Sequence, residues 1–230
     1  MFENIISNTS KTIVGNVEKI KLTIAAIISE GSILIEDYPG SGKTTFAKSI
    51  TLSLGLNFKR IQFTSDLLPS DVLGYNILSD DKLKFQKGPI FTNIVLADEL
   101  NRGSPKAQSA FLEAMEEKNV TIDGESYNLP EPFFVIATQN PMDTSGTSSL
   151  PDSQLDRFMV SYSLSDLDQK NKILMLKKNI SFSNSVSEAI NWSQINDKKN
   201  EITVKDEIYE YVVDIEPVSY THLRAHETDR

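Results

Sequence analysis

The stretch "DYPGSGKTT", residues 37–45, constrains the fold more than any other part of the chain. It follows the apolar run "SILIE" and precedes a segment whose apolar residues recur at helical spacing: Phe46, Ala47, Ile50 and Leu54. A strand, a glycine-rich turn and a helix together form a phosphate site, because the amides of the turn and the helix N-terminus both favour an anion. The sequence therefore predicts an α/β domain organised around a bound phosphate.

The turn fits the pattern G-x-x-x-x-G-K-[ST] with one departure, since Asp37 stands where the first glycine is expected. Gly40 and Gly42 let the backbone amides turn toward phosphate oxygens. Lys43 is expected to reach the β- and γ-phosphates, and the Thr44 hydroxyl to ligate Mg²⁺. The alternative is a glycine-rich turn with a solvated lysine.

The remaining pattern is that of a parallel sheet with helices on its faces, because short β-branched runs alternate with helical segments. Further strands are expected at 58–63, 93–97 and 132–138, and the segment 64–91 is polar and rich in turn residues. From about Ser165 the pattern becomes helical and rich in lysine. The fold class predicted is α/β with a parallel sheet, followed by a smaller helical domain.

Two local signals lie between these strands. Ser104 followed by Pro105 predicts the start of a helix, and its buried face is expected to consist of Ala107, Ala110, Phe111, Ala114 and Met115. The run "NVTIDGESYNL" predicts a β-hairpin that turns at Asp123 and Gly124.

The apolar run "NIVLA" ends in two carboxylates, Asp98 and Glu99. A bound triphosphate needs both a magnesium ion and a positioned water, so Asp98 is expected to hold the Mg²⁺ shell and Glu99 to act as general base. Simple capping of the following loop is the alternative. "VIATQNP" brings Gln139 and Asn140 beside the acids if its strand is the neighbour, and Asn140 then contacts the γ-phosphate or the water. An Asn-Pro pair is otherwise an ordinary turn signal.

Charge and composition exclude several classes of protein. A formal net charge of −9 and a pI near 4.8 count against a protein that coats nucleic acid or an anionic membrane. The chain has no cysteine and two histidines, which rules out disulfides and makes a histidine-based metal site improbable. Because the sequence has neither a long apolar span nor a signal peptide, it predicts a cytoplasmic protein.

In order and spacing, these motifs resemble the MoxR family of AAA+ ATPases. The resemblance runs from about Ile13 to about Leu164 and rests on "PGSGKTT", "GPIFTNIVLADELNRGSPKAQSAFLEAMEEKNVTIDG", "PFFVIATQNP" and "LPDSQLDRF". It implies a P-loop NTPase αβα sandwich followed by a helical lid. It also implies a homo-oligomeric ring, usually a hexamer, with ATP at each subunit boundary.

The resemblance assigns roles to individual residues. Asp98 and Glu99 match Walker B, Asn140 the sensor 1 position, and Arg157 an arginine finger that reaches the neighbouring subunit's nucleotide. A surface ion pair is the alternative for this arginine, and Arg102 is the second candidate for a charge acting in trans. The expected Walker A loop consists of Pro39, Gly40, Ser41, Gly42, Lys43, Thr44 and Thr45.

Other parts of the resemblance are less specific. Val14 and Gly15 match a segment that usually packs near the adenine. Two insertions typical of the family, at 74–89 and 119–127, are expected to face the pore of the ring or its substrate. The ion pair expected for Arg157, should it not act in trans, is with Asp152 or Asp156.

Three segments are expected along the chain: a nucleotide-binding core at 1–164, the start of a truncated lid at 165–217, and a non-native tail at 218–230. The tail, "VSYTHLRAHETDR", resembles translated sequencing adapter and has few apolar residues to offset the cost of ordering its backbone. The only arginines after Arg157 are Arg224 and Arg230, so the family's sensor 2 arginine is expected to be missing.

The function predicted is ATP binding and Mg²⁺-dependent hydrolysis by a ring-forming motor that remodels or chaperones partner proteins. A von Willebrand A-domain protein is the kind of partner that the family implies. One alternative is a nucleotide-gated binding module with little hydrolysis, and another is a DNA motor related to ring helicases, against which the acidic balance counts. The preference for adenine rests on the family, together with the lack of an N-K-x-D motif. The sequence does not identify the partner protein on which the motor acts.

Overall fold

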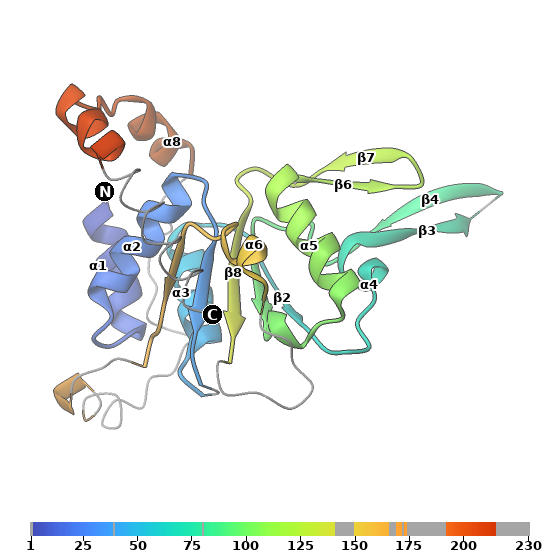
Figure 1. Cartoon of the computed structure of the whole chain (residues 1–230), viewed down its shortest axis with the longest axis horizontal. Helices are drawn as coiled ribbons and strands as arrows, with labels where there is room; N and C mark the ends of the chain where they lie inside the picture. Colours follow the sequence, from blue (N-terminus) through green and yellow to red (C-terminus); the bar gives the residue numbers. More distant parts are fainter. Residues whose placement is uncertain are drawn as a thin grey trace, which may run out of the picture. The chain divides into compact units, whose positions relative to one another are not determined.

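The computed structural model describes residues 2–38, 40–79, 81–140, 150–165, 169–171, 173 and 192–214. The chain divides into two compact units, Met1–Trp192 and Ser193–Arg230. The first unit holds the main sheet and the phosphate loop (Figure 1).

The main sheet has five strands in the order β2-β5-β8-β1-β9, and every pairing in it is parallel. Its strands are β1 (Ile33–Glu36), β2 (Phe58–Gln62), β5 (Ile94–Asp98), β8 (Phe134–Gln139) and β9 (Val160–Tyr162). The expected parallel α/β fold and its four expected strands are confirmed. The sequence does not predict β9, because three residues with only one β-branched apolar side chain give no recognisable run.

Strands β5 and β8 lie side by side in the interior of the sheet. All five residues of β5 are buried, as are the first five of β8. Leu96 pairs with Ile136, and Ala97 pairs with Ala137. The continuous apolar runs of both strands reflect burial on two faces, which is usual for parallel sheets covered by helices. This pairing brings the ends of the two strands, where the predicted site residues stand, to one edge of the sheet.

Helices cover both faces of this sheet: α1, α2 and α3 lie on one side, and α4 and α5 on the other (Figure 1). The helices are α1 (Phe2–Thr12), α2 (Val17–Ile28), α3 (Lys43–Ser53), α4 (Pro69–Leu73), the 3-10 turn η1 (Leu100–Arg102), α5 (Pro105–Glu117) and α6 (Asp152–Leu155). Among the described residues, no helix is both long and apolar enough to cross a bilayer.

Helix α5 begins as the sequence predicts. The Ser104 hydroxyl accepts a hydrogen bond from the Ala107 amide at 3.3 Å, and Pro105 is the first helical residue. The expected apolar face packs into one core with the odd-numbered residues of β5 and β8, and Phe111 meets Phe63 edge to face at a ring-centroid distance of 5.3 Å. This packing holds the segment between β5 and α5, which carries Glu99, against the sheet.

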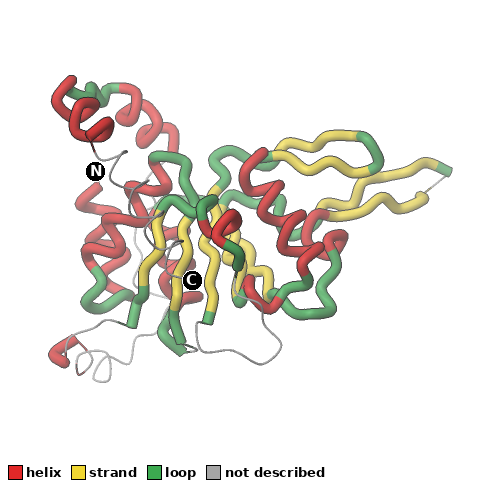
Figure 2. Tube along the Cα trace, in the orientation of Figure 1, coloured by secondary structure: helices red, strands yellow, loops and turns green. Residues whose placement is uncertain are grey.

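Two hairpins extend beyond the main sheet (Figure 2). The predicted one consists of β6 (Asn119–Ile122) and β7 (Glu125–Asn128), and its turn residues Asp123 and Gly124 both have positive φ, at 51° and 84°. The other consists of β3 (Gly74–Ser79) and β4 (Lys82–Lys87). Its strands are largely exposed, so they lack the apolar alternation that would have predicted them.

The hairpins contact each other through side chains. The rings of Phe85 and Tyr127 stack with centroids 4.0 Å apart, and Asn76 Nδ2 donates to Asp123 Oδ2 at 2.7 Å. The exposed β3–β4 strands carry Leu78 and Leu83 with more than two thirds of their surface open to solvent. The two insertions therefore form one projecting structure.

The second unit is described over residues 193–214. It holds most of α8 (Trp192–Asn200), and residues 206–214 are also helical. Apolar side chains exposed among the described residues of this unit are Ile202, Val204, Ile208, Tyr209, Tyr211, Val212 and Val213. Its helical character agrees with the sequence, whereas the boundary expected at 164/165 stays a prediction. The segment 218–230, with Arg224 and Arg230, lies outside the described residues.

Candidate nucleotide-binding site

The glycine-rich loop joins β1 to α3 and leaves open space in front of it. Gly40 and Gly42 both have a φ of +86°, a conformation that strains any residue with a side chain. A Cβ atom at either position would meet no atom within 4 Å. Pro39 lies outside the described residues, and Ser41 is half-buried between the two glycines. The loop can therefore receive an anion.

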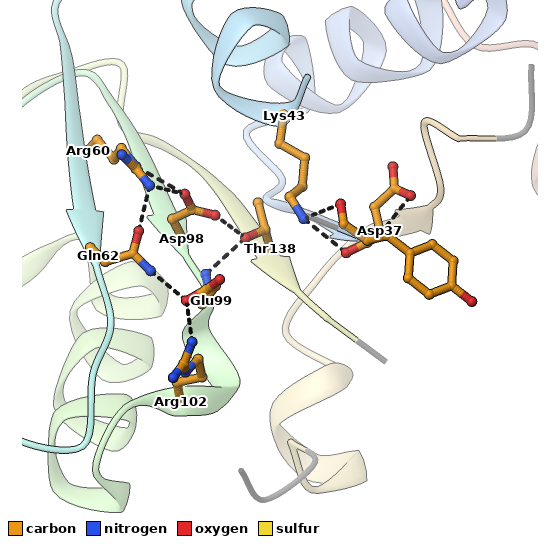
Figure 3. A network of polar contacts seen from close by, with 9 residues as sticks. Asp37, Lys43, Arg60, Gln62, Asp98, Glu99, Arg102 and Thr138 are labelled. Carbon is orange, nitrogen blue, oxygen red and sulfur yellow. Dashed lines mark hydrogen bonds and ion pairs between the residues drawn. The ribbon is translucent and has the colours of Figure 1, made fainter. Parts of the chain in front are cut away.

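Lys43 is the first residue of α3 and is buried. Its Nζ donates to the backbone oxygens of Asp37 at 2.9 Å and Tyr38 at 3.2 Å (Figure 3). Within the described residues these hydrogen bonds go to neutral carbonyls and none goes to a carboxylate. A buried ammonium without a counter-ion favours a bound anion, because pairing would offset its desolvation cost.

Thr138, on β8, contacts both acids: it binds the side chain of Asp98 and the backbone of Glu99. Its Oγ1 donates to Asp98 Oδ1 at 2.6 Å and accepts from the Glu99 amide at 2.9 Å (Figure 3). Glu99 is in the left-handed region, with φ 54° and ψ 47°. This conformation is uncommon outside glycine and often marks a functional site. The sequence points to the acids but not to Thr138, whose role depends on which strands are neighbours.

The Glu99 carboxylate is held from two sides. Gln62 Nε2 donates to its Oε2 at 2.8 Å, and Arg102 Nη1 lies 3.2 Å from the same oxygen. Both donors contact Oε2, so among the described residues Oε1 has no protein donor and is available to a water molecule. Arg102, the second candidate for a charge acting in trans, thus contacts the acid of its own chain.

Asp98 is paired with an arginine from the edge strand β2. Arg60 donates from Nε at 3.0 Å and from Nη2 at 2.6 Å, both to Asp98 Oδ2. Its Nη2 also donates to Gln62 Oε1 at 2.5 Å. Neither Arg60 nor Gln62 is singled out by the sequence, because β2 carries no motif of its own.

The loop, Arg60 and the two acids line one cavity of about 360 Å³. It is lined by Gly40, Gly42, Lys43, Thr44, Thr45, Arg60, Asp98 and Glu99. The structure therefore brings the loop and the two acids together, as the motifs predict. Asn140 comes one residue after β8 and is half-buried at the same edge of the sheet, although it does not line this cavity.

Val14 and Gly15 lie between α1 and α2 and do not line the phosphate cavity. Val14 is buried, and a Cβ atom on Gly15 would come within 2.6 Å of the Asn171 side chain. Gly15 also has a φ of +77°, so its positive φ and this close contact both favour glycine here. The contact of this segment with an adenine stays a prediction.

Arg157 lies at the end of the sheet where the parallel strands begin, opposite to the end that carries the phosphate loop and the acids. It precedes β9, whereas Glu99 follows β5, and the strands are parallel. Its Nη1 pairs with Glu116 Oε2 of α5 at 2.8 Å, so the ion pair differs from those expected with Asp152 or Asp156. A second cavity of about 240 Å³ contains Arg157 together with Ser32, which precedes β1. Arg157 is therefore remote from the phosphate loop of its own chain.

Asp37, the departure from the loop pattern, is buried and binds the segment after β9. Its Oδ2 accepts from the Leu164 amide at 3.0 Å, and its Oδ1 from the Tyr38 amide at 3.1 Å and from the Ser165 hydroxyl. Burial alone would raise the pKa of the Asp37 carboxyl, but these hydrogen bonds hold it below its usual value. Asp37 thus ties the start of the loop to residues 163–165.

We expect Asp37→Asn to lower the free energy of unfolding at neutral pH by about 1–3 kcal/mol, because an amide cannot accept all of these hydrogen bonds. A carboxyl whose folded pKa is depressed stabilises the fold above its unfolded pKa. That contribution is lost as the pH falls below about 3.8 and through the lower folded pKa. Urea unfolding at several pH values measures it, with the exposed Asp66→Asn as control. Equal stability of Asp37→Asn and the unchanged chain at neutral pH would contradict the assignment.

A phosphate loop beside two acids, on a parallel sheet of this order, defines a P-loop nucleotide-binding domain. A model of the ATPase family associated with various cellular activities (AAA) matches residues 32–160. A crystal structure of a candidate ATPase from Cytophaga hutchinsonii superposes with a TM-score of 0.81 at 37% identity, covering 92% of this chain and 66% of that one. The chain belongs to the AAA family and, within it, to the MoxR-type ATPases.

Two curated relatives illustrate this membership. The uncharacterized protein YeaC of Bacillus subtilis is 51% identical over 156 residues, which cover 67% of this chain and 49% of the relative. Chaperone MoxR1 of Mycobacterium tuberculosis is 40% identical over 159 residues, covering 68% of this chain and 42% of the relative. The match thus spans about half the length of these relatives.

Proposed function

We propose that this chain binds ATP with Mg²⁺ in the cavity at the end of β1 and β5 and hydrolyses it. The observation that carries the proposal is the placement of Lys43, Thr44, Asp98 and Glu99 around one cavity. A cation and loop amides suit the phosphates, and an oriented carboxylate suits a water molecule. Membership of an ATPase family supports the same chemistry.

The residues present fit a magnesium ion. The Thr44 hydroxyl and the Asp98 carboxylate line the same cavity, and oxygen donors are the ligands that Mg²⁺ prefers. Among the described residues there is no group of three or more acids, histidines or cysteines that could hold a metal. This donor set suits an ion that arrives with phosphate oxygens as its other ligands.

Different residues of the chain bind the phosphates and activate the water. Lys43 leaves the loop carbonyls to bind terminal phosphate oxygens, while Gly40 and Gly42 give those oxygens close access to backbone amides. Glu99 orients a water through Oε1 and accepts its proton, with Gln62 and Thr138 holding the acid in place. When bound, Mg²⁺ supplies positive charge that stabilises the charge developing on the phosphate oxygens.

Removal of the lysine tests this proposal at the binding step. We expect Lys43→Ala to weaken the affinity for a fluorescent ATP analogue by about 10-fold to 100-fold, because a charge-assisted contact to phosphate is lost. Lys48→Ala is the matched control, since Lys48 lies on the same helix but is exposed and stands over the Phe58 ring. Nucleotide affinity that is the same in Lys43→Ala and the unchanged chain would contradict the proposed site.

We further propose that several copies of the chain assemble into a ring, which the Arg157 substitution described below tests. We also propose that this assembly remodels or chaperones partner proteins. The placement of Arg157 across the sheet from its own phosphate loop supports an assembly in which each subunit completes its neighbour's site. The relative named as a chaperone supports action on proteins. A von Willebrand A-domain protein is the partner class proposed, on the family resemblance alone. The two joined hairpins, with Leu78 and Leu83 exposed, are the proposed contact surface.

A further inference from the structure

Arg60 is a charged residue of the cavity to which the proposed function gives no role. Its side chain is 48% exposed, whereas that of its partner Asp98 is 9% exposed. Figure 3 shows the guanidinium directed from β2 onto the acid at the end of β5. An exposed cation thus covers a buried carboxylate at the point where the metal shell is expected.

The hydrogen bonds leave Asp98 little capacity for another ligand. Each carboxylate oxygen can accept about two hydrogen bonds. Arg60 supplies two donors to Oδ2, at 3.0 Å and 2.6 Å, and Thr138 supplies one to Oδ1 at 2.6 Å. Oδ1 keeps one acceptor site, but a metal-bound water that donates to Oδ2 must displace Arg60. The positive charge of Arg60 also repels a metal ion held at either oxygen.

We propose that Arg60 is a positioning residue of the nucleotide site, which holds Asp98 in the nucleotide-free chain and competes with the hydrated Mg²⁺ for its carboxylate. The inference rests on the proposed function, because it takes Asp98 to be the acid that holds the metal shell. The half-exposed side chain of Arg60 can turn toward solvent or toward a phosphate, and it then gives up its hydrogen bonds to Asp98 and to Gln62 Oε1. The arginine thus neutralises a buried charge until the metal replaces it.

The neighbouring residue offers a matched control. Lys59 is exposed and carries the same charge on the same strand. Successive side chains of a strand point to opposite faces, so Lys59 lies on the other face from Arg60. A neutral substitution at either position changes the net charge equally, but only one of them removes a ligand of Asp98.

The experiment measures the affinity of the full chain for a fluorescent ATP analogue, once with excess Mg²⁺ and once with EDTA. The ratio of the two dissociation constants, EDTA over Mg²⁺, reports how much the metal contributes to binding. We expect Arg60→Gln to raise this ratio by about threefold to tenfold, a range typical of one partly exposed charged contact. We expect Lys59→Gln to leave the ratio within about twofold, since general electrostatics act weakly at a distance in salt.

Two further variants locate the effect at the acid. Arg60→Lys keeps the positive charge but loses the paired Nε and Nη2 donors of the guanidinium, so it should give an intermediate ratio. In an Asp98→Asn background, Arg60→Gln should no longer change the ratio, because the contested carboxylate is gone. An unchanged or lower ratio in Arg60→Gln would overturn the inference, and so would an equal rise in Lys59→Gln.

Failure of the inference differs from failure of the proposed function. If only the inference is wrong, the unchanged chain still binds the analogue through Lys43, and substitution of Arg60 leaves the metal contribution as it was. If the proposed function is wrong, binding of the analogue is absent or insensitive to Lys43→Ala in both buffers. That second result overturns both.

Discussion

Glu99→Gln should bind ATP with unchanged affinity while its turnover falls by at least about 100-fold, the usual effect of losing a general base. Glutamine nearly matches the shape of the acid but cannot accept a proton from water. It can still accept hydrogen bonds from Gln62 and Arg102, which contact the acid at 2.8 Å and 3.2 Å. Phosphate release and equilibrium binding, measured on the same preparation, separate the two effects.

The control for this prediction is Glu36→Gln. Glu36 ends β1 at the same edge of the sheet, but its Oε1 accepts from the Ser161 hydroxyl at 2.8 Å and it does not line the cavity. Its substitution should leave turnover within about twofold, as for most surface changes. Hydrolysis by Glu99→Gln at the rate of the unchanged chain would show that another group activates the water.

Arg157→Ala should leave the ATP affinity of the isolated chain unchanged and reduce hydrolysis in the assembly by at least about 100-fold. An arginine finger that reaches the nucleotide typically raises the turnover number by about 10³-fold to 10⁵-fold. The reason is geometric: Arg157 precedes β9 while Glu99 follows β5, so the two residues lie at opposite edges of a parallel sheet. Arg157 is thus remote from the acids of its own chain, so the proposed role in hydrolysis requires the nucleotide of a neighbouring subunit.

A mixing experiment tests action in trans. Arg157→Ala subunits combined with Glu99→Gln subunits should recover part of the activity, because one kind of boundary then has both groups intact. Lys118→Ala is the matched control, since Lys118 shares the second cavity with Arg157 but pairs with Glu30 at 2.6 Å. Absence of recovery, with mixing of the subunits verified by cross-linking, would count against this role.

Much of the fold could be predicted from the sequence because burial leaves a signal in it. The runs that became β1, β5 and β8 are continuously apolar, since helices cover both faces of the sheet. The β6–β7 hairpin was predictable because Asp123 and Gly124 suit its two positive φ angles. The β3–β4 hairpin and β9 were missed, because exposed or very short strands carry no such pattern.

The site was predictable only where its residues are neighbours in sequence. Lys43 and Thr44 belong to one motif, and Asp98 and Glu99 to another. The contacts that hold the acids come from β2 and β8, so they depend on strand order and register. No local pattern encodes the hydrogen bonds from Arg60 and Thr138. The burial of Asp37 likewise depends on β9 passing beside β1.

The most direct test of the central claim is a crystal structure of Glu99→Gln with a slowly hydrolysed ATP analogue and Mg²⁺. We predict that the triphosphate lies against the loop at 40–44, with the metal near the Thr44 hydroxyl and the Asp98 carboxylate. In the same crystal, Arg60 should have left Asp98 Oδ2. An analogue bound elsewhere, with Lys43 still on the carbonyls of Asp37 and Tyr38, would contradict the account.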